Sequence, residues 1–466
     1  MTNKQRPIMI LGCTSDAGKS LVVTAICRLL ANRGVKVAPF KAQNMSNNAA
    51  ITKDGLEIGR AQYLQAIAAK TTPSALMNPV LLKPSADTFS QVIINGKVDS
   101  VISNMPWMER KKLLWPKVLS ALSQLQDEYE QVVIEGAGSP AEINLRQGDI
   151  VNMSVALACQ ADVYLVSDID RGGSFAHLLG TWACLAPEEQ KLIKGFVLNK
   201  FRGDPALLGN AMQWLEDKTG IPTVANLPYH RHQLPEEDSF RLANNWQHGV
   251  INVALIYYPY ASNMDEFDAL SHQQDINLVP VSECQDLSVF DAIILPGSKN
   301  SGKSLAFLQE NGLDKQIHAF SKTGKLVLGV CGGLQILGQH INDPLKLEDG
   351  NKKALGLLDI STTLAHNKAT KQVNLQWLEQ KLEAYEIHHG KSVVLNDTVH
   401  SFIAEHIGWQ QGNVYATYLH GLFDNKVFYN WFMAQFNAPQ NGIDWKEHIN
   451  QELDNLANMF EEHGWL

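Results

Sequence analysis

Short apolar runs alternate with helix-like segments along two stretches of the chain. In the first stretch the apolar runs cover residues 8–11, 36–40, 132–134, 163–166, 195–198 and 223–225, and a helical pattern covers 19–32. In the second stretch the apolar runs cover residues 250–256, 292–295, 326–328 and 414–417. Continuous apolar runs of this length are typical of strands covered on both faces. The pattern predicts an α/β protein with two doubly wound, mostly parallel sheets.

A polar and acidic segment separates the two stretches. It covers residues 234–248 and contains the run Pro-Glu-Glu-Asp at 235–238. We therefore predict a first domain over 1–233, a linker over 234–249, a second domain over 250–430 and a helical C-terminal extension over 431–466. The tail from residue 428 onward is expected to pack on the second domain.

The composition excludes several classes of protein. The chain has 466 residues, too many for one ordinary core, and its formal net charge is −9. A nucleic-acid binder needs a basic face, so that class is disfavoured. The six cysteines form no C-x-x-C pair, and residues 1–7 lack the apolar core of a signal peptide, which together predict a cytoplasmic protein. We expect no membrane span, and the sequence leaves a homo-oligomer open.

The segment from Gly12 to Ser20 has the order strand, glycine-containing loop, Gly-Lys-Ser, helix. Backbone N–H groups of such a loop surround phosphate oxygens, and the helix N-terminus favours negative charge. Lys19 is expected to reach the β- and γ-phosphates of ATP, and the Ser20 hydroxyl to bind Mg²⁺. The remaining loop residues expected at the nucleotide are Thr14, Asp16, Ala17 and Gly18. The alternative is an ordinary turn between a strand and a helix.

The first glycine of this loop stands one place early, because Cys13 occupies the position that usually holds glycine. In this the loop resembles that of dethiobiotin synthetase and its relatives. Glu135, which ends an apolar run and precedes Gly-Ala-Gly, is predicted to bind Mg²⁺, the alternative being a plain strand-ending glutamate. The resemblance also implies that Asn199 recognises adenine. Glu57 is either a second magnesium ligand or part of a solvated helix surface.

A second candidate site centres on Cys331, within Val-Cys-Gly-Gly-Leu at 330–334. An apolar run leads into the cysteine and a helical pattern leads out, as in a nucleophile elbow. A helix N-terminus stabilises the reactive thiolate. His420, about ninety residues further on, is a candidate base for this nucleophile. The alternative for an apolar-flanked cysteine is an inert place in the core.

The order of these elements resembles class I glutamine amidotransferases. The turn at Gly297 and Ser298 would aim N–H groups at the oxyanion that forms when Cys331 attacks an amide. The resemblance also places Gly332, Leu334 and Gln335 at the oxyanion or glutamine. That family usually carries His-x-Glu, but Leu422 stands where the glutamate belongs. Asp424 is a weak substitute, and we predict a Cys/His dyad in which His420 is oriented by a backbone carbonyl or by no group.

The combination of this ATPase with a glutaminase lacking His-x-Glu resembles the two corrinoid amidases. The segments 40–48, 58–62, 167–173 and 385–390 are similar to those of cobyric acid synthases in particular. This resemblance implies that glutamine and ATP serve to amidate the b, d, e and g carboxylates of a corrinoid, without a tightly bound prosthetic group. Lys41, Asn44 and Asp168 are then expected at the substrate or phosphates.

Purely structural roles for these residues and two other functions of the protein stay open at this point. Lys41 and Asn44 also suit a surface loop with local turns, and Asp168 suits an internal salt-bridged turn. One alternative function is that of a cobyrinic acid a,c-diamide synthase. The other is a partitioning-type ATPase with a degenerate amidotransferase domain, although such ATPases usually show a second lysine early in the loop, where this chain has none.

Overall fold

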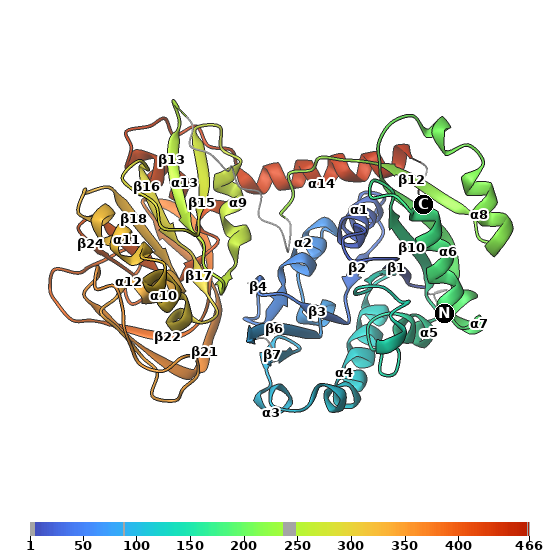
Figure 1. Cartoon of the computed structure of the whole chain (residues 1–466), viewed down its shortest axis with the longest axis horizontal. Helices are drawn as coiled ribbons and strands as arrows, with labels where there is room; N and C mark the ends of the chain where they lie inside the picture. The colour runs from blue at the N-terminus through green and yellow to red at the C-terminus, as the bar shows by residue number, and fades with distance from the viewer. Residues whose placement is uncertain (1–4, 87–88, 236–247, 464, 466) are drawn as a thin grey trace.

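The computed structural model describes residues 5–86, 89–235, 248–463 and 465 as two α/β bodies that lie side by side (Figure 1). A long helix, α14 (Trp445–Glu462), extends from the second body across to the first. The two mostly parallel sheets confirm the predicted fold class. Within the described residues, no helix has the length and apolarity that a membrane span requires.

The first domain is built on a six-stranded sheet in which every neighbouring pair is parallel. Its strands, in spatial order, are β12 (Thr223–Pro228), β11 (Ile193–Phe201), β10 (Asp162–Asp168), β1 (Ile8–Gly12), β9 (Gln131–Glu135) and β2 (Val37–Phe40). β1 is the first strand in sequence and has neighbours on both sides. Its end therefore lies between the ends of β9 and β10, where ligands of open α/β sheets bind.

Helices cover both faces of this sheet because alternate residues of its strands point to opposite sides. Ile10 packs among residues of α1 (Lys19–Asn32), while Met9 and Leu11 belong to the core on the other face. The remaining helices of the domain are α2 (Arg60–Ala68), α3 (Ser100–Ser103), α4 (Trp107–Glu128), α5 (Met153–Cys159), α6 (Ser174–Cys184), α7 (Pro187–Gln190) and α8 (Ala211–Thr219).

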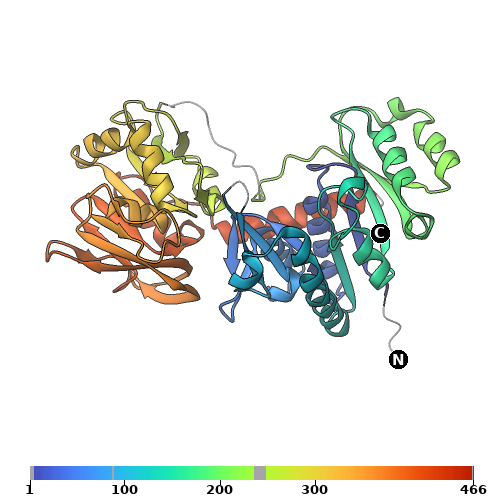
Figure 2. The same cartoon turned by 60° about the horizontal axis from the view of Figure 1, so that its bottom comes forward.

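An insertion of small strands between β2 and α3 faces the second domain. It holds β3 (Gln43–Met45), β4 (Ala49–Ile51), β5 (Glu57–Gly59), β6 (Val80–Ala86), β7 (Phe89–Ile94) and β8 (Lys97–Val98). A small apolar cluster joins the insertion to the other body, because Ala49 and Ile51 pack with Tyr385 and Ile387. The two domains are thus in direct contact through this insertion (Figure 2).

The second domain contains a seven-stranded sheet and a five-stranded sheet. The first has the order β15 (Ile276–Val281), β13 (Ile251–Ile256), β16 (Ala292–Leu295), β18 (Leu326–Val330), β25 (Val414–Thr417), β24 (Gly408–Gln411) and β23 (His400–Ser401). Its first five strands are parallel. The other has the order β20 (Lys352–Lys353), β19 (His340–Asn342), β21 (Ile360–Trp377), β22 (Gln380–Val394) and β26 (Leu419–His420).

The long antiparallel hairpin of β21 and β22 has no counterpart among the predicted strands. The helices of this domain are α9 (Asp268–Ser271), α10 (Ser301–Glu310), α11 (Leu313–Ser321), α12 (Gly332–Leu337) and α13 (Lys426–Ala434). Two short strands, β14 (Ala261–Ser262) and β17 (Gly297–Ser298), pair above the end of the parallel sheet. The predicted linker over 234–249 lies largely outside the described residues.

Helix α14 connects the domains rather than belonging to the second one alone. At its start the Trp445 ring lies 5.2 Å from the His272 ring of the second domain. Further along, Asp454 accepts two hydrogen bonds from Arg28 of α1, at 2.7 and 2.9 Å. The expectation that the whole tail packs on the second domain is therefore wrong.

Candidate active site

The loop between β1 and α1 has the geometry of an anion-binding loop. Gly18 adopts a left-handed conformation, with φ at 94°, immediately before α1 begins at Lys19. A Cβ on Gly12 would lie 2.7 Å from the carbonyl oxygen of Thr14 and 2.9 Å from Lys19 Nζ, so only glycine fits there. The loop leads its backbone directly into the positive end of a helix, where N–H groups attract anions. Thr14, Asp16 and Ala17 lie within it as predicted.

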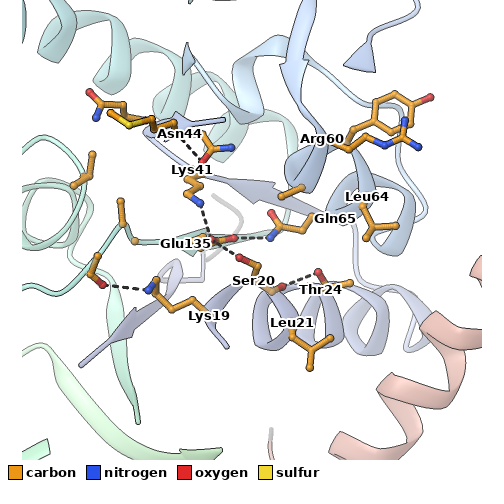
Figure 3. A pocket seen from close by; sticks show the side chains of 18 of the residues that line it. Lys19, Ser20, Leu21, Thr24, Lys41, Asn44, Arg60, Leu64, Gln65 and Glu135 are labelled. Atoms are coloured by element: carbon orange, nitrogen blue, oxygen red, sulfur yellow. Dashed lines mark hydrogen bonds and ion pairs between the residues drawn. The ribbon is translucent and has the colours of Figure 1, made fainter. Parts of the chain in front are cut away.

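Lys19 and Ser20 extend from the first turn of α1 toward the end of β9 (Figure 3). Lys19 Nζ donates to the carbonyl oxygens of Gly138, at 3.2 Å, and Thr14, at 3.3 Å. Ser20 Oγ donates to Glu135 Oε1 at 2.8 Å. The structure thus brings together three residues that the sequence predicted at the phosphates and the metal.

Glu135 is 1% exposed and is the centre of a hydrogen-bond network (Figure 3). Besides the bond from Ser20, Lys41 Nζ donates to Oε1 at 2.8 Å and Gln65 Nε2 donates to Oε2 at 2.6 Å. Burial raises the pKa of Glu135, but the charge of Lys41 and the hydrogen bonds outweigh it, so the pKa lies below its ordinary value. Glu135 is therefore an ionised carboxylate at neutral pH.

The chemistry of this site fits Mg²⁺. A carboxylate beside a serine hydroxyl offers the oxygen ligands that this ion prefers, and Mg²⁺ commonly keeps water and phosphate oxygens as its other ligands. Among the described residues, no group of three or more His, Cys, Asp or Glu side chains is placed to hold a metal. Ser20 and Glu135 are the residues that would hold it.

Asn199 and Asp168 lie at the ends of the neighbouring strands β11 and β10 and contact the other side of the loop. Asn199 Nδ2 donates to the carbonyl oxygen of Ala17 at 2.9 Å. Lys200 Nζ donates to Asp168 Oδ2 at 2.9 Å and to the Asp16 carbonyl oxygen at 2.8 Å. Asp168 thus forms the salt-bridged arrangement named above as its alternative, and both side chains support the loop.

A cavity of about 1510 Å³ opens beside the phosphate-binding loop. Lys19, Ser20 and Glu135 line it, as do Lys41 and Asn44, the latter 4% exposed. Its far wall includes residues of β22 and of the segment after β26, which belong to the second domain, and residues of α14, which connects the two domains. These are Glu383, Ala384, Tyr385, Gly421, Asp424, Trp445, Lys446, Ile449 and Asn450. The cavity is therefore shared by both domains.

Glu57 is not brought to Ser20 and Glu135. Its carboxylate forms an ion pair with Lys83, and Lys368 of β21 donates to its two oxygens at 2.9 and 2.7 Å. Burial raises the pKa of Glu57, but the charges of Lys368 and Lys83 lower it by more. The pKa therefore lies well below its ordinary value, and this carboxylate is ionised. Glu57 is a buried ionic contact between the domains, and nothing in this arrangement resembles a magnesium ligand.

Cys331 occupies a strained turn between β18 and α12. Its φ is 50° and its ψ is −102°, an unusual conformation for a residue with a side chain. A Cβ on Gly333 would lie 2.1 Å from the carbonyl oxygen of Leu295, so a larger residue does not fit beside the turn. This is the geometry of a nucleophile elbow, in which strain holds the sulfur at the end of the sheet.

The turn at Gly297 and Ser298 lies against this elbow. A Cβ on Gly332 would lie 2.5 Å from the backbone nitrogen of Ser298. The backbone nitrogen of Ser298 therefore lies close to Gly332, the residue after Cys331, which suits stabilisation of an oxyanion. Leu334 is fully buried in the core, and Gln335 Oε1 accepts a hydrogen bond from Ser301 Oγ at 2.6 Å. Those two side chains support the elbow in this structure.

His420 lies next to the same turn and has a carboxylate partner. A Cβ on Gly297 would lie 3.3 Å from His420 Cε1. His420 Nδ1 lies 2.9 Å from Glu266 Oε1, and Glu266 Oε2 accepts the backbone N–H of Gly421 at 3.1 Å. Nε2 of His420 has no hydrogen-bond partner among the described residues and is free to act on the thiol or on the substrate. The predicted dyad is wrong, because Glu266 orients the imidazole.

Burial and neighbouring charge shift the pKa of His420 in opposite directions. Burial lowers its pKa, whereas the Glu266 carboxylate and Cys331 raise it, and the balance lies above the ordinary value. The imidazole is therefore poised as a cation beside the nucleophile, as a proton donor to a leaving nitrogen requires. Asp424 is not the third member. Its carboxylate lies 3.8 Å from Arg60 Nη2, and burial raises its pKa to about 6.

Glu266 was missed because it is 154 residues away from His420 in the sequence. It belongs to a 3₁₀ turn, Met264–Phe267, that follows β13 and β14. A signal did exist. β13 and β18 are parallel strands of one sheet, so the acidic residues after β13 come to the edge that carries Cys331. Asp265 and Glu266 are adjacent there, and the sequence does not say which one turns toward His420.

Comparison with known proteins gives a consistent picture for both halves. Residues 8–239 match the family described as the CobQ/CobB/MinD/ParA nucleotide binding domain, and residues 252–428 match the CobB/CobQ-like glutamine amidotransferase domain. The chain is 45% identical to a cobyric acid synthase of Polaromonas sp., over 98% of this chain and 96% of that protein.

Two further curated relatives carry the same name. A cobyric acid synthase of Deinococcus radiodurans is 46% identical over 92% of this chain and 93% of its own length. One of Polaromonas naphthalenivorans is 48% identical over 98% of this chain and 97% of its own length. With both catalytic halves present in one polypeptide of matching length, the chain belongs to the cobyric acid synthase family.

Proposed function

We propose that this chain amidates the b, d, e and g carboxylates of adenosylated cobyrinic acid a,c-diamide, giving cobyric acid in cobalamin synthesis. Glutamine supplies the nitrogen and ATP activates the carboxylates. The observation that carries the proposal is the cavity of about 1510 Å³, lined by Ser20 and Glu135 on one side and by Tyr385 and Gly421 on the other. It exceeds the volume of an ordinary small-molecule pocket, roughly 300–1,000 Å³, and suits a nucleotide together with a macrocycle.

Glutamine hydrolysis is assigned to Cys331, His420 and Glu266. The thiolate of Cys331 attacks the side-chain amide carbon, and the N–H of Ser298 stabilises the oxyanion. The carbon–nitrogen bond breaks as His420 Nε2 gives its proton to the departing nitrogen, which leaves as NH₃. Water then hydrolyses the thioester to glutamate. Glu266 holds the imidazole in orientation through Nδ1 during both steps.

Carboxylate activation is assigned to the phosphate-binding loop. An oxygen of the corrinoid carboxylate attacks the γ-phosphorus of ATP, ADP leaves, and an acyl phosphate forms. NH₃ attacks its carbonyl carbon, and phosphate departs to leave the amide. Lys19 and the N–H groups of the loop bind the phosphates, and Lys41 offers a second ammonium group in the same cavity. Mg²⁺, held by Ser20 and Glu135, would neutralise charge on the transferred phosphoryl group.

The state of the cysteines supports a reducing compartment, and we place the protein in the cytoplasm. All six are free thiols, and Cys13, Cys27 and Cys331 are buried. Burial raises the pKa of Cys13 to about 11, so this thiol of the phosphate-binding loop is inert at neutral pH.

Isotope transfer tests the proposed reaction. The full chain is incubated with Mg·ATP, glutamine labelled with ¹⁵N in its side-chain amide, and cobyrinic acid a,c-diamide, and products are measured by mass spectrometry. We expect four ¹⁵N atoms per corrinoid, with one ADP and one glutamate formed for each amide. In a parallel incubation with cobyrinic acid in place of its a,c-diamide, labelling at a and c, with no label gained by the a,c-diamide, would indicate the a,c-diamide synthase reaction. ATP hydrolysis without labelled corrinoid would refute the proposal.

A further inference from the structure

Helix α2 contacts the phosphate site with one residue and the glutaminase site with another. Gln65 Nε2 donates to Glu135 Oε2 at 2.6 Å. Arg60, the first residue of α2, places Nε 2.5 Å from Asp265 Oδ2 of the second domain. Asp265 is adjacent in sequence to Glu266, which orients His420. Three side-chain contacts, joined by the backbone of α2 and by the peptide bond between residues 265 and 266, thus connect the carboxylate assigned to Mg²⁺ with the histidine assigned to glutamine hydrolysis.

The residues of this chain are buried. The exposed fractions are 1% for Glu135, 0% for Gln65, 4% for Asp265, 3% for Glu266 and 1% for His420. Solvent screens such contacts weakly, so an ion pair among them keeps its orientation and strength. The Arg60 side chain, at 16%, is the most exposed member of the set. These six residues, which we call the α2 relay, are Glu135, Gln65, Arg60, Asp265, Glu266 and His420.

The turn that carries Glu266 is also held directly by the first domain. Asn263 donates its backbone N–H to Asn48 Oδ1 at 2.9 Å, and its Oδ1 accepts the N–H of Ala49 at 3.2 Å. Asn263 itself has a left-handed backbone, with φ at 56°. The orientation of Glu266 therefore depends on contacts from the insertion and from α2, in addition to contacts within its own domain.

We propose that Arg60 is a positioning residue through which occupancy of the phosphate site controls glutamine hydrolysis. The inference rests on the proposed assignment of Mg·ATP to Glu135 and of glutamine to Cys331. Mg·ATP engages Glu135, whose Oε2 is the acceptor for Gln65, so it changes the contact at that point of α2. Because Arg60 and Gln65 lie about 1.4 turns apart on one helix, a displacement at Gln65 is transmitted to the Arg60–Asp265 ion pair.

The α2 relay has a testable consequence, because coupling between two binding events is reciprocal. If Mg·ATP changes the reactivity of the Cys331 site, occupancy of the Cys331 site must change the affinity for Mg·ATP. The test uses the full chain and needs no corrinoid. Glutamate release and the rate at which iodoacetamide alkylates Cys331 are measured with and without Mg·ATP, and nucleotide binding is measured by calorimetry before and after alkylation.

In the wild type we expect Mg·ATP to change both glutamate release and alkylation at least fivefold. Arg60→Gln should reduce the ratio between the rates with and without Mg·ATP to about one. Arg60→Lys, which keeps the charge, should retain part of the response. Gln65→Leu breaks the other contact of the helix, and the double variant should show no greater loss than either single variant. Non-additivity of this kind separates a shared path from two independent defects.

Arg28→Gln is the matched control. Arg28 is also a buried arginine that pairs with an aspartate of another structural unit, Asp454 of α14, but it lies outside the relay. Its variant should keep the wild-type ratio.

A wild type without any response to Mg·ATP, or an Arg60→Gln variant that keeps the full response, would overturn the inference. If Arg60→Gln fails to fold, Arg60→Lys and Gln65→Leu decide the question. These measurements use no corrinoid, so they remain interpretable if the ¹⁵N-transfer assay fails to show amidation.

Discussion

Replacing Glu266 by glutamine tests the carboxylate that the sequence did not reveal. The substitution keeps the size of the side chain and removes its charge. In the wild type one carboxylate oxygen lies 2.9 Å from His420 Nδ1 and the other accepts the Gly421 N–H. A glutamine can preserve one of these contacts, but its NH₂ group cannot accept a proton from Nδ1. The variant therefore loses the imidazolium partner and disturbs the tautomer of His420.

The magnitude follows from the geometry of this pair. Two unit charges about 4 Å apart attract by about 4 kcal/mol at an effective dielectric constant of about 20. A hydrogen bond to a charged group contributes about 1.5–3 kcal/mol net. Since about 1.4 kcal/mol corresponds to a tenfold change in rate, we expect glutamine turnover to fall about 10- to 1,000-fold. The pKa of His420 should fall as well, because Glu266 is the main charge that raises it.

The assay is release of glutamate at saturating glutamine, followed across pH. His420 is cationic below its pKa, so a lower pKa in Glu266→Gln should move the alkaline limb of the profile to lower pH. Amidation with added ammonium salt serves as the check that the first domain is intact. Asp424→Asn is the matched control, since Asp424 is a neighbouring carboxylate that faces Arg60. We expect its basal glutamine turnover to stay within about threefold of wild type.

The outcome that refutes this picture is specific. If Glu266→Gln retains turnover within threefold and Asp424→Asn loses a hundredfold or more with its fold intact, Asp424 is the partner of His420 in solution. If both variants are nearly active while His420→Ala is inactive, the enzyme works as a dyad and the observed Glu266 contact is only structural.

Three further predictions concern the other residues. Cys331→Ser should abolish amidation from glutamine and retain amidation from ammonium salt, both followed by chromatography of the corrinoid, because only ammonia release needs the thiolate. Lys19→Ala and Glu135→Ala should each reduce amidation from either nitrogen source more than a hundredfold while basal glutamate release persists; a wild-type rate in either variant would refute the phosphate-site assignment. The hydrogen bond from Arg28 lowers the pKa of Asp454 to about 2, so Asp454 stabilises the fold above about pH 4 and this contribution is lost as pH falls toward 2. The difference in urea midpoint between wild type and Asp454→Asn should be constant near neutrality and shrink over that acidic window, and an unchanged difference at pH 2.5 would contradict it.

Local motifs made much of this molecule predictable. The phosphate-binding loop is specified by consecutive residues, since Gly12, Gly18 and Lys19 each occupy a position fixed by backbone geometry or by the start of a helix. The same holds for Cys331, whose flanking glycines allow a strained turn between a buried strand and a helix. Glu135 could be placed because it ends a strand beside β1, and the ends of neighbouring parallel strands meet at one edge.

Features that depend on partners distant in sequence were not predictable in this way. From the sequence alone, Glu57 is equally consistent with a surface carboxylate and with a metal ligand. Its actual partner, Lys368, is 311 residues away in the sequence. The amphipathic pattern of α14 predicts a helix but does not say which surface receives it, and its partner Arg28 lies in the other domain. Glu266 belongs to the same class, because a short polar turn carries no periodicity that fixes the direction of one carboxylate.

The position of Glu266 also explains why the relay arises in this fold. An acid that follows the histidine by two residues comes from the same short segment of chain, so its position does not require a separate turn. Here the acid lies on a separate turn after β13, and that turn is fixed by Asn48 and Arg60 of the first domain. The geometry of His420 therefore depends on how the two domains dock. An enzyme arranged in this way has a direct physical means of releasing ammonia only when the site that consumes it is in place.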